Sequence, residues 1–269
     1  MAKSEITNGH GILKWYWEVT RQLFPPLCWC CRIWLTDGKR YSEAYPFLCP
    51  ECLDALPWIP SETFCFACGH RTMDSNTLCS ACVDDKFHFD RLWGGFRYED
   101  VIQEWVLQFK FGKKEHMALL LGQLLSLSVK ECFDLWEVDA IIPIPLHHKR
   151  LYQRGFNQAH LLAYHTFSKS KLLQPLWLRR MRHTAPQVEL SATKRVLNVQ
   201  GAFQADSRVK GKRLLLVDDV MTTGATLDAA AQSLKNEGAL SVDVIVLAQR
   251  VLSNVNTPNP KNFSGSIQL

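Results

Sequence analysis

The chain has 269 residues, which is long enough for two modules, and its 47% apolar and 21% charged residues exclude global disorder. No apolar run reaches the roughly 18 residues that cross a bilayer, and the N-terminal residues lack the apolar core of a secretory signal. We therefore expect a cytoplasmic protein without a membrane span.

The net charge of +5 conceals one strongly basic window. Residues 147–213 contain 14 Lys and Arg against 2 Asp and Glu, whereas the rest of the chain is mildly acidic. Positive charge of this density is typical of a surface that binds phosphate, pyrophosphate or nucleic acid. A solvated surface with counter-ions is the alternative interpretation.

The N-terminal third is rich in cysteine, with eight of its nine cysteines arranged as four C-x-x-C pairs. Such a turn directs two thiolates at one point and so supplies half of a tetrahedral zinc site. Disulfides and redox-active pairs are the alternatives, but the missing secretory signal and four pairs in succession favour metal. Sequential pairing predicts two structural zinc ions, one held by Cys28, Cys31, Cys49 and Cys52 and the other by Cys65, Cys68, Cys79 and Cys82.

The order in which these pairs combine stays open. Sequential pairing is favoured because Pro57 and Pro60 separate the two halves as a linker would, whereas a cross-braced arrangement would interleave alternate pairs. Cys30 is a spare thiol that could displace Cys28 or Cys31. We expect a structural role for the metal, since a segment of this size holds too little apolar core without it.

After the cysteine-rich segment, strands alternate with helices. Hydrophobic periodicity predicts strands over residues 93–98, 138–145, 174–181, 213–217 and 242–248, and helices over 101–109, 115–131, 156–168 and 225–237. This alternation indicates an α/β fold with a mostly parallel sheet that is covered on both faces. The polar, proline-containing tail from Ser253 onward is typical of a disordered segment.

The most specific motif is residues 214–226, LLLVDDVMTTGAT, in which a buried strand is followed by two acids and a small-residue loop that opens a helix. Hydroxyls and backbone N–H groups of such a loop can hold one phosphate at the helix N-terminus. The two acids suit diol hydroxyls and a divalent ion. A sugar 5-phosphate would satisfy the whole set, namely Asp218, Asp219, Thr222, Thr223, Gly224, Ala225 and Thr226.

Two further segments belong with this motif. The strand IIPIP leads into a basic segment that predicts a pyrophosphate-binding loop, with charge from Lys149, Arg150 and Arg154 and close backbone approach at Gly155. A later polar stretch, which includes Gln187 and Arg195, predicts a flexible loop that closes over the reacting centre.

Residues 214–226 resemble the motif by which type I phosphoribosyltransferases bind 5-phosphoribosyl 1-pyrophosphate (PRPP). Over residues 24–250 the chain resembles the ComF family, which includes ComFC- and GntX-type proteins. This resemblance also rests on FPPLCWCC, CPECLDALPWI, CFACG, PIPLHHKRLYQRGFNQA, RHTAPQ and NVQGAF. It implies a double zinc ribbon over residues 24–88, a phosphoribosyltransferase-like domain over 93–252 and a disordered tail over 253–269.

The resemblance implies a role in natural transformation or the use of external DNA. One hypothesis is that the protein binds PRPP with Mg²⁺ and handles or imports single-stranded DNA, together with proteins of the competence machinery at the inner face of the membrane. The alternative hypothesis is an active phosphoribosyltransferase, for which the sequence identifies neither the acceptor nor a catalytic residue. A basic groove that continues beyond the PRPP pocket would favour DNA, whereas a closed base pocket would favour transfer.

Overall fold

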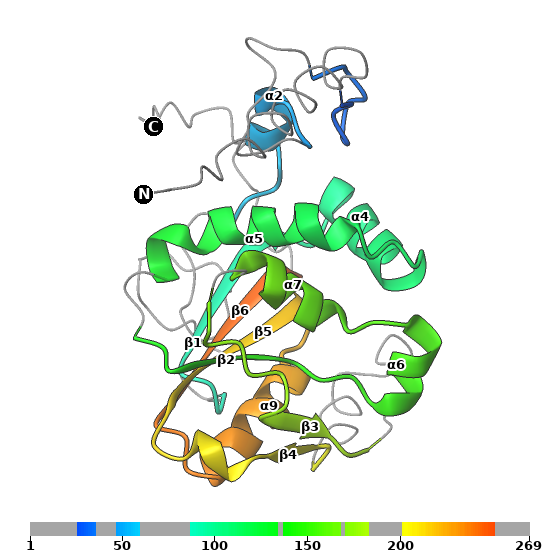
Figure 1. The fold of residues 1–269 in the computed structure, drawn as a ribbon. Coiled ribbons are helices and arrows are strands. Elements are labelled where there is room, and N and C mark those ends of the chain that lie inside the picture. The colour runs from blue at the N-terminus through cyan, green and yellow to red at the C-terminus, as the bar shows by residue number, and fades with distance from the viewer. Residues whose placement is uncertain are drawn as a thin grey trace, which may run out of the picture. The chain divides into compact units, whose positions relative to one another are not determined.

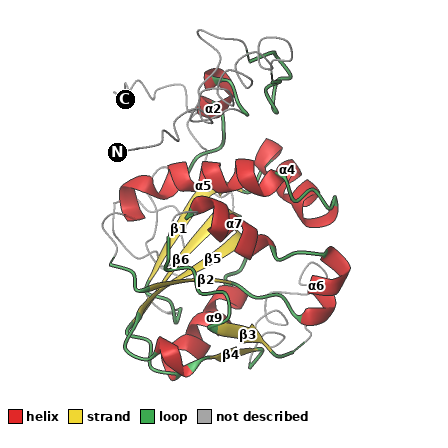
Figure 2. Cartoon of the chain, in the orientation of Figure 1, coloured by secondary structure: helices red, strands yellow, loops and turns green. Residues whose placement is uncertain are grey.

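The computed structural model describes residues 26–35, 47–59, 87–133, 137–167, 170–182 and 201–250. These residues belong to two compact units, which divide between Leu56 and Pro57. The first unit contains the described cysteines, and the second contains the α/β elements (Figures 1 and 2). The second predicted cysteine set, the predicted flexible loop and the C-terminal tail lie outside the described residues.

The described part of the first unit is a tight turn followed by a short helix. Leu27 and Trp34 form an antiparallel bridge around the turn, and the Cys28 N–H donates to the carbonyl of Ile33 over 2.8 Å. Helix α2 (Pro50–Asp54) begins directly after Cys49, with proline in its first turn, where a missing N–H is tolerated. The two C-x-x-C pairs therefore lie on elements too short to fold without a further constraint.

Four parallel strands form the sheet of the second unit. Their order is β1–β6–β5–β2, and the parallel pairing is the one that the alternating pattern in the sequence predicts. Most residues of strands β2, β5 and β6 are buried, which explains why the sequences of these strands are continuous apolar runs. The strands are β1 (Arg91–Arg97), β2 (Ala140–Pro143), β5 (Arg213–Met221) and β6 (Ser241–Gln249).

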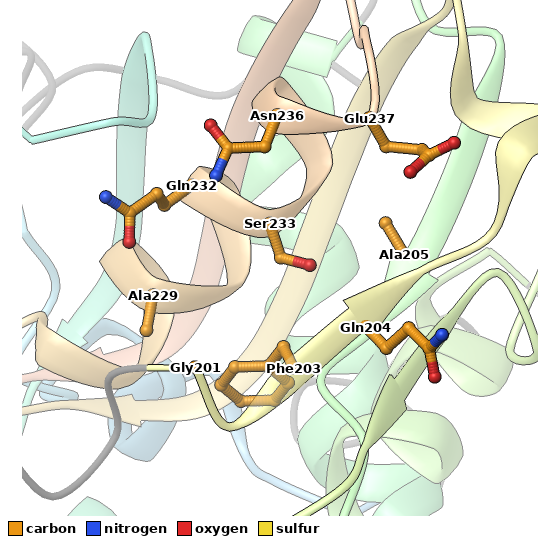
Figure 3. Close-up of a pocket in the computed structure, with 9 residues that line it drawn as sticks. All are labelled: Gly201, Phe203, Gln204, Ala205, Ala229, Gln232, Ser233, Asn236 and Glu237. Carbon is orange, nitrogen blue, oxygen red and sulfur yellow. The ribbon is translucent and has the colours of Figure 1, made fainter.

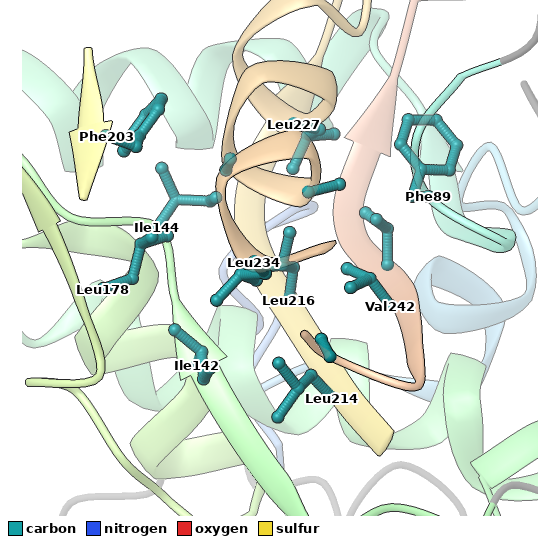
Figure 4. Packing of buried hydrophobic residues seen from close by; sticks show 14 of the residues in the cluster. Phe89, Ile142, Ile144, Leu178, Phe203, Leu214, Leu216, Leu227, Leu234 and Val242 are labelled. Carbon is teal, nitrogen blue, oxygen red and sulfur yellow. The ribbon is translucent and has the colours of Figure 1, made fainter. Parts of the chain in front are cut away.

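Helices cover both faces of this sheet (Figure 1). One face carries α4 (Asp100–Phe111), α5 (Met117–Phe133) and α7 (Gln158–Thr166). The other carries α9 (Ala225–Asn236) and a two-stranded antiparallel sheet of β3 (Leu178–Arg180) and β4 (Phe203–Ala205). On that face Leu214, Leu216 and Val242 of the sheet pack with Leu227 and Leu234 of α9 in one buried cluster (Figure 4).

The predicted strand over residues 174–181 is shorter than expected and does not join the main sheet. Leu173 makes one parallel bridge to Ile141 of β2, and the chain then turns, with the Trp177 N–H donating to the carbonyl of Gln174. Pro175 occupies the second position of this turn, where its fixed φ is favourable. Only β3 remains extended, and it pairs with β4.

The segment predicted as a basic loop contains a short helix, α6 (His148–Arg154). The His147 ring accepts a hydrogen bond from the Lys149 N–H and so caps the helix. Gly155, with a φ of +90°, ends it in the left-handed region. A short helix replaces a loop here because these caps are local and strong.

No helix in the described ranges is long and apolar enough to cross a membrane.

Parallel pairing brings the carboxyl ends of three strands to one edge of the sheet. The Ile144 N–H, just after β2, donates to the carbonyl of Val217 in β5 over 2.9 Å. On the other side of β5, the Arg250 N–H donates to the carbonyl of Met221 over 2.9 Å. The segment that follows β2 therefore starts beside the acidic end of β5, at the edge where open α/β folds bind ligands.

Candidate functional site

The predicted phosphate loop connects β5 to α9. The strand continues to Met221, beyond the predicted end at residue 217, and Gly224 is the N-cap of α9. The φ of Gly224 is +77°, and a Cβ there would lie 3.0 Å from both Met221 Cε and Phe87 Cε1. Glycine is therefore required at this position by backbone conformation and by packing.

The loop contains a buried hydroxyl that needs a partner. Thr223 Oγ1 has no hydrogen-bond partner in the described part of the protein. The N-cap residue, Gly224, has no side chain to bond the first amides of α9. An unpaired buried hydroxyl is costly, and helix N-termini bind anions, so a phosphate group fits this loop on both counts.

The two acids of the motif point to opposite faces of the sheet, because they are consecutive residues of a strand. Asp218 continues the alternation of Leu214 and Leu216 and so faces the α9 side. Asp219 faces the other side, where its Oδ1 lies 2.8 Å from Nζ of Lys110 on α4. The Asp219 N–H donates to Asp218 Oδ1 over 2.8 Å, which ties the pair together.

Asp218 is hard to ionise in this position. Burial, helped by the charge of Asp219, raises its pKa from 3.8 to about 7. Lys110, the Asp219 N–H and Arg180 act in the opposite direction and keep the pKa from rising further. The carboxyl group therefore changes charge close to neutral pH, as is common for carboxyl groups in functional sites.

Arginines from α6 and β3 surround the pair. Partial burial lowers the pKa of Arg150, Arg154 and Arg180, and the charges of Asp219 and Asp218 partly restore that of Arg154. Aromatic rings hold two of these guanidinium groups, since Arg154 lies 5.3 Å from the Phe111 ring centroid and Arg180 lies 5.3 Å from that of Phe203.

The sequence predicted some of these residues and missed others. Asp218 and Asp219 precede the phosphate loop on β5, Arg154 lies within reach of both acids, and Arg150 acts on Arg154, whereas Lys149 is exposed on the first turn of α6. Lys110 was missed because it ends an ordinary amphipathic helix and belongs to no motif. The sequence marked Arg180 only as one of the cations of the basic window. What sets it apart from the others is the ring of Phe203, which lies on the paired strand β4.

The basic window does not form one surface of free charge. Arg208 is paired with Asp206 over 2.7 Å, and Arg213 is paired with Asp139 and Glu137. The arginines that flank the acidic pair form a second group. Arg179 and Arg182 form a third, exposed group. Among the described residues, the cations of the basic window therefore differ in environment, because some are paired with acids, some flank the acidic pair and some are exposed.

In the first unit, two C-x-x-C pairs gather at one point. The four Sγ atoms of Cys28, Cys31, Cys49 and Cys52 all lie within 4.8 Å of one another. Cys30 is exposed and is not part of this cluster. This arrangement is the one that sequential pairing predicts, and a four-thiol cluster of this size can hold a zinc ion.

The thiols of this cluster have unequal affinities for protons. Burial works to raise the pKa of Cys28, but backbone N–H groups of Cys49, Cys31 and Cys30 outweigh it and lower the pKa to about 7. Burial raises the pKa of Cys49 to about 11, and it raises that of Cys52 as well. A bound cation would reverse these increases, because thiolate ligands release their protons on coordination.

A separate groove of about 290 Å³ lies between β4 and α9 (Figure 3). Its lining is mostly polar and contains no residue of the predicted site. The lining residues are Gly201, Phe203, Gln204, Ala205, Ala229, Gln232, Ser233, Asn236 and Glu237.

Comparisons with known proteins identify the relatives of this chain. Residues 178–259 match the family described as "Phosphoribosyl transferase domain". "DNA utilization protein YhgH" of Escherichia coli K12 is 33% identical over 232 residues, which cover 84% of this chain and 97% of that protein. "Competence protein F" of Haemophilus influenzae is 30% identical over 210 residues, covering 75% and 90%. "Competence protein ComFC" of Bacillus subtilis is 30% identical over 209 residues, covering 74% and 83%.

The cysteine cluster leads to a prediction about zinc. We expect about two zinc ions per chain in the purified protein, and replacing Cys28→Ser should remove about one, because a three-thiol site holds zinc less tightly. Elemental analysis measures the loss. Cys30→Ser is the matched control and should keep the full content, since Cys30 lies outside the cluster. Protein that contains disulfides and no zinc would contradict the assignment.

The buried position of Asp218 leads to a prediction about stability and pH. The folded protein resists ionising Asp218 between its ordinary pKa of 3.8 and about 7, so this residue lowers stability as pH rises through that range. We therefore expect Asp218→Asn to be stabilising, by an amount that grows by about 1–2 kcal/mol between about pH 5.5 and pH 8.

Urea unfolding of zinc-loaded protein at the two pH values measures this difference. Glu115→Gln is the control, because Glu115 is exposed and its replacement should have an effect that does not grow with pH. A stability gain for Asp218→Asn that is the same at both pH values would show that burial does not oppose ionisation at this position.

Proposed function

Because this chain belongs to the ComF family and has a phosphoribosyltransferase-type domain, we propose that it binds PRPP with Mg²⁺ and handles single-stranded DNA. The observation that carries the PRPP part is the meeting, at one sheet edge, of a loop with an unpaired hydroxyl and an acidic pair flanked by arginines. The names of the relatives, which refer to DNA utilization and competence, support the DNA part.

Each part of PRPP has a complementary group at this edge. The 5-phosphate fits residues 222–226, where Thr223 Oγ1 has no partner and the N-terminus of α9 has no side-chain cap. The ribose hydroxyls fit the carboxylates of Asp218 and Asp219. The pyrophosphate fits Arg150 and Arg154, which α6 brings next to the pair.

The charge balance favours an anionic ligand. Lys110, Arg154 and Arg180 act on the acidic pair, and the charge of Arg150 acts on the last two, so cations outnumber the two carboxyl groups here. PRPP carries a phosphate and a pyrophosphate, and a Mg²⁺ ion bound with it would neutralise part of the pyrophosphate charge. Carboxylate oxygens are the ligands that such an ion prefers, so the residues present fit it.

The surface of α6 supports the DNA part of the proposal. None of its residues is buried, and Tyr152 is 92% exposed. Phe111, whose ring lies under the Arg154 guanidinium, is 69% exposed. Aromatic rings beside Lys and Arg are the usual platform for single strands, because the rings stack on bases while the cations contact the backbone.

Transfer of the ribosyl group is a second candidate, favoured by the half-buried position of Asp218. A carboxylate that is partly shielded from water can stabilise the positive charge that develops on the ribosyl carbon as pyrophosphate leaves. Release of pyrophosphate from PRPP in the presence of DNA or of nucleobases would support this candidate.

Thr223 provides the test of the PRPP site. Replacing Thr223→Val keeps the shape and removes the unpaired hydroxyl, so the fold should be preserved. The affinity for PRPP-Mg²⁺ should fall about tenfold or more, since one hydrogen bond to a charged group is lost. Isothermal titration calorimetry measures it. Ser233→Ala, on α9 but away from the loop, should bind as the wild type does, and equal affinity in Thr223→Val would exclude the loop from the site.

Tyr152 provides the test of the DNA platform. We expect single-stranded oligothymidylate to bind with a strong salt dependence, of slope about −0.7 per neutralised phosphate. Tyr152→Ala should weaken this binding by about 1–3 kcal/mol and leave the salt slope unchanged, because stacking is lost and the cations stay. Fluorescence anisotropy measures both. Tyr164→Ala is the control, an exposed tyrosine on α7, and wild-type protein that does not bind at low salt would refute the platform.

A further inference from the structure

Lys110 lies at the end of a helix that fixes its backbone in place. The residue before it, Phe109, is fully buried and stacks on Phe156 with ring centroids 5.3 Å apart. Two residues later, Gly112 ends α4 with its N–H donating to the carbonyl of Gln108, and a Cβ at Gly112 would lie 2.5 Å from that oxygen. The backbone at Lys110 is therefore anchored on both sides, while its side chain keeps its rotatable bonds.

The side chain of Lys110 reaches the acidic pair from the far side of the sheet. Its Nζ lies 2.8 Å from Asp219 Oδ1, and the side chains are 20% and 9% exposed. One oxygen of Asp219 is therefore occupied in the free protein, at the carboxylate that the proposed ribose and metal contacts would use. An ammonium group and a divalent cation compete for the same carboxylate oxygen, because both are attracted by its charge.

We propose that Lys110 is an exchangeable counter-ion of the acidic pair, which occupies Asp219 in the free protein and moves to the pyrophosphate when PRPP binds with its metal ion. The inference rests on the proposed function. Its structural basis is the contact between Lys110 and Asp219, together with the arginines that mark where the pyrophosphate would lie.

The consequence is that metal binds only together with PRPP. A free divalent ion is repelled by Lys110, Arg154 and Arg180 around the two carboxyl groups, and Lys110 already contacts one oxygen of Asp219. PRPP brings negative charge that attracts both the metal and the lysine, so the exchange becomes favourable. Lysine suits this role better than arginine, because its compact ammonium on a flexible stem can change partners without the fixed geometry of a guanidinium fork.

The experiment compares Mn²⁺ binding, measured by electron paramagnetic resonance, with and without PRPP in zinc-loaded full-length protein. The wild type should bind Mn²⁺ at this site only when PRPP is present. Lys110→Met removes the charge and keeps the length, so it should bind Mn²⁺ without PRPP at least tenfold more tightly than the wild type. Its affinity for PRPP in the presence of Mn²⁺ should fall about tenfold, since the contact with pyrophosphate is lost.

Three further variants make the result specific. Lys114→Met is the matched control, because Lys114 is exposed nearby and contacts Gln108, not the acidic pair. Lys110→Arg keeps the charge and should still exclude free Mn²⁺. Lys110→Gln can retain a hydrogen bond to Asp219 and should behave as Lys110→Met does, which keeps the test decisive if the methionine variant does not fold.

The possible failures are distinguishable. If the wild type binds PRPP while Lys110→Met and Lys110→Gln match it in both Mn²⁺ and PRPP affinity, the exchange is refuted and the proposed function stands. If the wild type binds Mn²⁺ tightly at this site without PRPP, the exchange is refuted as well. If the wild type does not bind PRPP at all, the proposed function and the exchange are both refuted.

Discussion

Two adjacent carboxyl groups near the end of a buried strand are costly to keep, and the candidate site is organised around offsetting that cost. Asp219 is offset by Lys110 on one face of the sheet, and Asp218 lies in the field of Arg180 on the other. Neither cation removes the penalty on Asp218, whose pKa stays near 7. An unfavourable electrostatic environment that the protein does not fully offset is typical of residues that serve ligand binding and not stability.

The same constraint explains why elements distant in sequence converge on one edge of the sheet. The parallel pairing of β2 with β5 puts α6 and its arginines beside the acids, and the antiparallel β3–β4 pair brings Arg180 from the other side. Phe111 and Phe203 hold two of the guanidinium groups. The site is therefore positioned by strands and helices, which hold side chains more firmly than loops do.

The cysteine unit depends on a different interaction. Its described residues form one turn and one helix of five residues, and the apolar side chains that they bury are few, among them Leu35, Leu48 and Leu56. The four converging thiols can hold the turn and the helix together by binding one metal ion. Metal binding would then be the main source of the folding free energy of this unit. Zinc removal should consequently unfold this unit while leaving the parallel sheet, which has its own apolar core, intact.

The sequence by itself determined the features that are local in the chain. The C-x-x-C spacing, the acidic pair before a small-residue loop and the alternation of strands and helices are each set within a few residues, and the structure agrees with them. The short helix α6 was missed because its caps, His147 and Gly155, were interpreted as parts of a loop. The end of β5 was placed too early because acids are unusual in a buried strand.

Only the tertiary structure decided which charges meet. Lys110 and Arg180 are far from the acidic pair in sequence, and each is unremarkable in its own helix or strand. The basic window divided into paired, site-facing and exposed groups because each arginine's environment depends on which strand lies beside it. The sequence gives the number of charged residues in the chain. Which of them pair and which become buried depends on contacts between distant segments, and these contacts exist only once the sheet has formed.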